Sequence, residues 1–208
     1  MNAAKRQQFR WAKGSVQVAK KLLIMLLSHR KLSIDTKIQI FIQLTKHIIN
    51  PLFLIQFLIF PILLLLNYQI YDTAWAPALG IVAYLLLGPA TYLIMIRKIW
   101  RENWRTKAIQ YLFMIFYASG ISINNSVAIF DALVGKKNEF LRTPKFGIME
   151  KNQDWRNNKY ALPFTKTTLL EIFFSAYGCF TIAISLLSGN PIFVPLISIQ
   201  TIGFIYVA

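Results

Sequence analysis

The stretch Ile48–Tyr71 reads IINPLFLIQFLIFPILLLLNYQIY and contains no Asp, Glu, Lys or Arg. A helix needs roughly 20 apolar residues to cross the hydrocarbon core of a bilayer, which is about 30 Å thick. This stretch therefore predicts a transmembrane helix. Similar apolar runs occupy Trp75–Ile96, Thr168–Leu187 and Pro191–Ala208. We expect an all-α integral membrane protein with about four transmembrane helices.

Positive charge is confined to the segments between these runs. The formal net charge is +15, and all 23 Lys and Arg residues fall within 1–49, 97–107 and 136–166. The short turns at 72–74 and 188–190 contain none. Because loops rich in Lys and Arg stay in the cytoplasm, the three basic segments are predicted to lie there. The membrane would be a bacterial inner membrane, a plasma membrane or a Golgi-type membrane. A nucleic-acid partner is not expected, since no basic soluble domain is present to bind one.

Two further segments predict amphipathic helices at the membrane interface. Over 7–28, apolar residues recur at near-helical spacing beside lysines, and we expect the lysines to face the lipid headgroups. Ser33 then predicts the N-cap of the next helix. The segment 107–134 has polar residues at its centre, which are costly to expose to lipid. We interpret it as interfacial or re-entrant, because a crossing there would put the basic residues after it outside.

These patterns divide the chain into five parts. Residues 1–33 form a cytoplasmic interfacial helix, 34–98 the first two transmembrane helices, 99–135 a second cytoplasmic interfacial helix, 136–167 a polar cytoplasmic loop, and 168–208 the last two transmembrane helices. No polar tail follows the last apolar run, so we expect the C-terminus to be truncated.

No complete active site is recognisable in the chain. Its eight Asp and Glu residues include no Asp-x-Asp pair, and His29 and His47 are isolated. The single Cys179 lies inside an apolar run. No residues stand at the spacing of metal ligands, and the sequence has no Gly-rich phosphate loop. We therefore expect neither a catalytic residue nor a bound metal or cofactor in this chain.

Two short segments carry a different signal. Gln7, Arg10 and Trp11 form a Gln-x-x-Arg-Trp pattern at the start of the first basic helix. An Arg can bind a diphosphate through two hydrogen bonds, and a Trp face can stack on a sugar ring. Taken alone, the same residues also fit an interfacial Trp beside a snorkelling Arg. The second segment, 140–147, reads FLRTPKFG within the polar loop.

The first pattern resembles the Gln-x-x-Arg-Trp motif of processive family 2 membrane glycosyltransferases, the cellulose synthase group. The second is similar to the Phe-x-Val-Thr-x-Lys-Gly gating-loop motif of that family. Order and topology agree as well, since two spans and an interfacial helix separate the motifs and two spans follow. Arg142 stands where cellulose synthases have Val, and this form is more similar to the wider cellulose-synthase-like branch.

The resemblance implies roles for particular residues. Trp11 would stack on the terminal sugar of the acceptor glycan at the mouth of a membrane channel. Gln7 and Arg10 would help to hold the nucleotide diphosphate and the acceptor. Three residues would belong to the loop that closes over the nucleotide sugar: Phe140, Thr143 and Lys145.

The family's catalytic GT-A domain lies upstream of the Gln-x-x-Arg-Trp motif, and nothing in this chain matches it. The resemblance implies that a missing or separate catalytic domain binds the nucleotide sugar with Mg²⁺ or Mn²⁺. The chain would be the acceptor-binding and gating portion of a hexosyltransferase, inactive by itself. The polar residues in the apolar runs leave two alternatives open, a non-enzymatic transporter or channel subunit and a membrane scaffold subunit.

Overall fold

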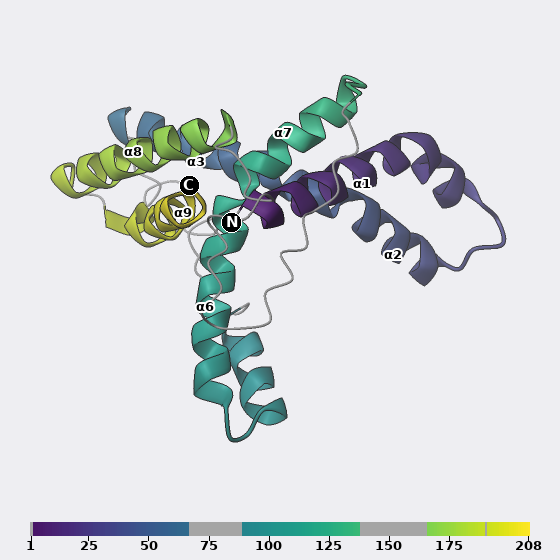
Figure 1. The fold of residues 1–208 in the computed structure, drawn as a ribbon, viewed down its shortest axis with the longest axis horizontal. Helices are drawn as coiled ribbons and strands as arrows, with labels where there is room; N and C mark the ends of the chain where they lie inside the picture. Colours follow the sequence, from purple (N-terminus) through teal and green to yellow (C-terminus); the bar gives the residue numbers. More distant parts are fainter. Residues whose placement is uncertain (1, 67–88, 138–165, 190) are drawn as a thin grey trace, which may run out of the picture.

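The computed structural model describes residues 2–66, 89–137, 166–189 and 191–208. Every regular element within these ranges is a helix (Figure 1), which confirms the all-α prediction. The helices are α1 (Asn2–Ser28), α2 (Ile34–Thr45), η1 (Lys46–Ile48), α3 (Ile49–Leu65), a helical segment at 89–99, α6 (Trp104–Gly120), α7 (Ser122–Leu133), α8 (Lys166–Leu187), η2 (Pro191–Phe193) and α9 (Val194–Val207).

Two of these helical stretches are long and apolar enough to cross a membrane. They are Ile34–Leu65, which joins α2, η1 and α3, and α8. Large apolar side chains remain exposed along both, among them Ile55, Ile62 and Phe173. Extended apolar surface of this kind is expected where a helix contacts lipid. The structure therefore indicates a membrane protein.

The predicted number of four spans is not reached within the described residues. Most of Trp75–Ile96 lies outside them, and α9 is a 14-residue helix. At 1.5 Å per residue such a helix is about 21 Å long, shorter than the hydrocarbon core. The four-span topology stays a prediction.

The segment around 107–134 contains α6 and α7, which meet at Ile121. The two helices are bent by 42°, as in a broken span or a re-entrant loop. Ser119, Asn124 and Asn125, next to the bend, are buried among other helices. Their burial removes the cost of exposing polar side chains to lipid.

Helices α1 and α2 form a hairpin whose turn lies at one edge of the molecule (Figure 1). The predicted N-cap at its turn is present, since Ser33 Oγ accepts a hydrogen bond of 3.3 Å from the backbone N–H of Thr36. On its other side α1 packs against α7. Helix α1 therefore contacts both α2 and α7.

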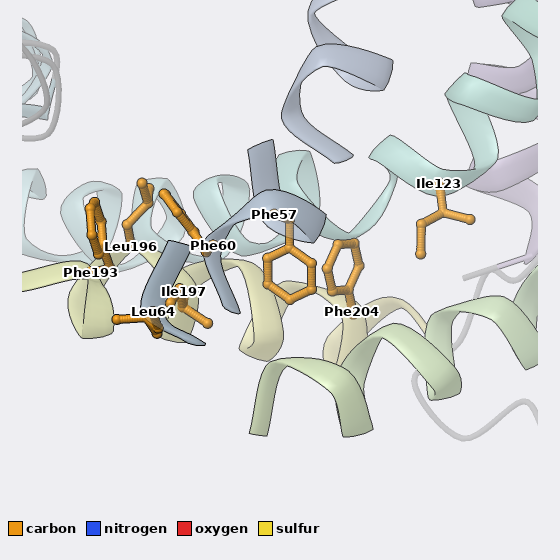
Figure 2. Close-up of a cluster of buried hydrophobic side chains, with 8 residues drawn as sticks. All are labelled: Phe57, Phe60, Leu64, Ile123, Phe193, Leu196, Ile197 and Phe204. Atoms are coloured by element: carbon orange, nitrogen blue, oxygen red, sulfur yellow. The ribbon is translucent and has the colours of Figure 1, made fainter. Parts of the chain in front are cut away.

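The main hydrophobic core lies where α3, α8 and α9 meet, with a contribution from α7 (Figure 2). The rings of Phe57 and Phe204 pack edge to face, with centroids 5.2 Å apart. Phe60 and Phe193 pack with centroids 4.6 Å apart. Aromatic pairs in this geometry stabilise a core beyond the area that they bury. This core holds α3, α8 and α9 together.

Candidate functional site

Helix α1 carries the Gln-x-x-Arg-Trp pattern and has one clearly buried face. The buried residues are Lys5, Ala12, Lys13 and Val16, which share this face at helical spacing. Helix-favouring Ala, Lys, Arg and Gln residues fill its first turns, and no proline interrupts it. The sequence thus forms a continuous helix that packs on one side and is open on the other.

The motif residues lie largely on the open side. Gln7 is exposed, and the side chain of Trp11, one turn further along, is 56% exposed. Positions four residues apart are neighbours on a helix surface, so Gln7 and Trp11 share one face. Arg10, beside them, is half-buried. The structure places the three predicted residues together and leaves an amide and an indole accessible.

A buried ion pair fixes this helix to α8. Lys5 Nζ donates to Glu171 Oε2 at 2.5 Å and to Thr168 Oγ1 at 3.5 Å. The side chains of Lys5 and Glu171 are only 3% and 0% exposed. Because a charge away from water needs a partner of opposite sign, this pair specifies how α1 sits against α8.

Two asparagines of α7 make further polar contacts near Lys5. Asn124 Nδ2 donates to the backbone carbonyl of Lys5 at 3.0 Å. The neighbouring Asn125 donates to Asn50 Oδ1 at 3.4 Å, and Asn50 donates to the carbonyl of His47 at 2.8 Å. These bonds join the start of α1 to α7 and to the beginning of α3.

Two lysines of α1 bind the end of α7. Lys13 Nζ donates to the carbonyl of Lys136 at 2.6 Å, and Lys20 Nζ donates to that of Leu133 at 2.8 Å. Ammonium groups are favourable at a helix C-terminus, where carbonyls are unpaired and the helix dipole is negative. Lys13 is buried in this contact, so it does not face the lipid headgroups as expected, whereas Lys20 remains exposed.

Lys5 and Lys13 lie on either side of the motif along the axis of α1. Lys13 binds Lys136, near the last described residue before 138–165, and Lys5 binds Thr168 and Glu171, near the first described residues after it. Residues on both sides of the segment 138–165 thus bind the helix that carries Gln7, Arg10 and Trp11.

The predicted gating residues Phe140, Thr143 and Lys145 lie outside the described residues.

Lys5 is the functional candidate that the sequence analysis missed. One signal was available, since Glu171 is the lone carboxylate in an apolar run and such a residue needs a partner. The 23 Lys and Arg residues offered too many candidates to choose from. The pairing joins residues 166 positions apart, which no local pattern encodes.

The polar residues that suggested a transport path mostly bond to one another. Gln200 Nε2 donates to Gln56 Oε1 at 3.1 Å, in addition to the contacts of Asn124, Asn125 and Glu171. Asn67 lies outside the described residues. Paired groups of this kind also stabilise helix contacts in a membrane, so these contacts of the described residues do not specifically favour a transporter.

Within the described part of the chain, no three His, Cys, Asp or Glu side chains gather into a group that could hold a metal ion. The Mg²⁺ or Mn²⁺ that the resemblance implies would be bound by the catalytic domain.

Comparisons with family models, curated proteins and solved structures find no match to this chain. The resemblance to membrane glycosyltransferases therefore rests on the two motifs and their order along the chain.

Proposed function

We propose that this chain is the membrane-embedded, acceptor-binding and gating portion of a glycosyltransferase. The enzyme transfers sugar from a nucleotide sugar to a growing polysaccharide or glycan acceptor. In the proposed topology the chain crosses the membrane four times, and both motifs lie on the cytoplasmic side. Another domain or polypeptide supplies the catalytic carboxylates and the metal-bound nucleotide sugar.

One observation carries the proposal. The helix that presents Gln7 and Trp11 also binds, through Lys13 and Lys5, residues on both sides of the segment that contains Thr143 and Lys145. A loop tethered at these two points can close over a ligand bound beside the motif. The proposal requires the second motif to reach the first, although well over a hundred residues separate them along the chain.

In the proposed mechanism, the indole of Trp11 stacks on the terminal sugar of the acceptor and excludes water from one face of the ring. Stacking orients the acceptor hydroxyl toward the donor sugar, and orientation is a large part of catalysis between two bound substrates. Gln7 hydrogen-bonds to the acceptor or to the diphosphate. Arg10 balances the charge of the diphosphate through its planar guanidinium.

The acceptor role can be tested without the catalytic domain. The purified chain in lipid nanodiscs is titrated with cellohexaose, chitohexaose and mannohexaose, and binding is followed by saturation-transfer NMR. We expect one hexasaccharide to bind and Trp11→Ala to weaken its binding at least ten-fold. Trp100→Ala is the matched control, because Trp100 is also an exposed Trp but lies far along the chain from the motif.

Unchanged affinity in Trp11→Ala, or equal losses in both Trp variants, contradicts the acceptor-stacking role. Absence of binding by all three hexasaccharides also counts against it, because together they sample the common β-linked backbones with and without N-acetyl groups.

A further inference from the structure

Gly14 lies in the interior of α1, where glycine is unfavourable. Its flexible backbone makes it destabilising in a helix relative to Ala. Yet the sequence places it only three residues after Trp11, in a helix that runs from Asn2 to Ser28. A helix tolerates such a glycine at a modest cost in stability relative to Ala.

Packing and backbone conformation explain the other described glycines. Gly135 and Gly189 have positive φ angles, which favour glycine. A Cβ at Gly120, Gly178 or Gly203 would clash with the neighbouring helix. Gly14 has neither feature, since a Cβ added there meets nothing within 4 Å and its φ is not positive. Among the described glycines it alone lacks a structural reason.

The direction of helical side chains shows what a residue at position 14 would cover. Each Cα–Cβ bond tilts toward the helix N-terminus, so a side chain lies over the turn that precedes it. A side chain at position 14 would therefore lie over Arg10 and Trp11, its neighbours at four and three residues before. Gly14 leaves this surface bare next to an indole that is 56% exposed.

We propose that Gly14 is a specificity-determining position, which keeps the surface beside Trp11 clear so that a sugar ring can lie flat on the indole. This inference rests on the proposed function and deepens it, because it identifies where the acceptor glycan approaches α1. A ring stacked on Trp11 extends past the edge of the indole, and the missing side chain lets it approach the helix backbone.

The test measures the dissociation constant of the best-binding hexasaccharide for Gly14 variants of the full chain in nanodiscs. We expect Gly14→Leu to weaken binding at least ten-fold and Gly14→Ser to have an intermediate effect. Lys21→Leu is the matched control, because Lys21 is exposed on α1 but projects over neither Trp11 nor Gly14. Thermal unfolding should show that Gly14→Ala is at least as stable as the native chain.

The outcomes separate this inference from the proposed function. If Trp11→Ala loses binding while Gly14→Leu and Gly14→Ser bind like the native chain, Gly14 has no role in ligand access. If Trp11→Ala keeps native affinity, the proposed function itself fails. A loss of stability in Gly14→Ala would show a packing role and overturn the inference. A loss of affinity in Lys21→Leu equal to that in Gly14→Leu would do the same.

Discussion

At the scale of single residues, the contact between Lys5 and Glu171 decides how the motif helix is held. Both groups are almost completely removed from water, and they approach to 2.5 Å. Gln7 and Trp11 follow Lys5 within two turns of the same helix. Any shift of Lys5 therefore moves the motif relative to α8 and to the loop that precedes it.

Removing one member of this pair leaves the other charge buried and unpaired. We expect Lys5→Met to destabilise the chain by about 3–5 kcal/mol, the usual cost of breaking a buried ion pair from one side. The double variant Lys5→Met with Glu171→Leu should recover most of the loss, since no buried charge remains. Denaturant unfolding in detergent micelles measures both effects.

Lys21→Met provides the control for that measurement, because Lys21 is exposed on the same helix. Its stability should stay close to that of the native chain. If Lys5→Met unfolds at the same denaturant concentration as the control, the ion pair does not anchor α1.

The sequence predicted the motif residues better than it predicted the contacts that hold the motif helix in place. Gln7 and Trp11 are recognisable because residue types and spacing are local information, and the structure finds them on one accessible face. Lys5 and Glu171 were not predicted as a pair, because the partner of a buried charge depends on tertiary packing. The burial of Lys13 was not predicted for the same reason, since its contact with the carbonyl of Lys136 is not visible in sequence.

At the scale of the helices, small residues set the closest contacts. Gly120 of α6 and Gly203 of α9 let the two backbones approach, and a Cβ at Gly203 would lie 2.6 Å from the carbonyl oxygen of Phe116. Small residues at such crossings are typical of membrane helices, where close packing replaces the hydrophobic effect as the main attraction.

Enlarging this contact should separate the two helices. We expect Gly203→Leu to lower the free energy of unfolding by about 1–3 kcal/mol, the usual range for overpacking. The backbone atoms of α6 cannot move aside easily. Steric-trap unfolding in bicelles would measure the change. Gly14→Leu is the control, because a side chain there meets open space. Equal stability of the two Leu variants would contradict the close α6–α9 packing.

Hydropathy predicted α3 and α8 well because lipid-facing helices are apolar over their whole length. The polar centre of 107–134 predicted an interfacial or re-entrant segment, and the 42° bend at Ile121 fits either a broken span or a re-entrant loop. The length of α9 was not predictable, because the apolar run 191–208 includes η2 as well as the helix. Both elements share one composition, so only the backbone distinguishes them.

At the scale of the whole molecule, the charge pattern predicts that the motif and the loop ends share one membrane side. Single cysteines at Gln7 and Lys137 should react with a membrane-impermeant maleimide from the cytoplasmic side, in a Cys179→Ser background. A cysteine at Ser188, in the turn after α8, should react from the opposite side. All three native positions are exposed, so their accessibility is suited to labelling.

Labelling of positions 7 and 188 from the same side would contradict the crossing of α8. Labelling of positions 7 and 137 from opposite sides would separate the two motifs across the membrane. That second result would remove the basis of the proposed function, because one helix could not then serve both motifs.

The most direct test of the glycan-acceptor role is elongation by the enzyme that contains this segment. Polymer product is measured per membrane-inserted molecule for Trp11→Ala, Trp11→Phe and the native residue. Misplacing a reacting group by about 1 Å can cost on the order of 100-fold in rate, so Trp11→Ala should lose elongation by about that factor or more. Trp11→Phe should retain part of the activity through its smaller aromatic face. Normal product per inserted Trp11→Ala molecule, with only the amount of inserted protein reduced, would show that Trp11 is a membrane anchor and would contradict the account.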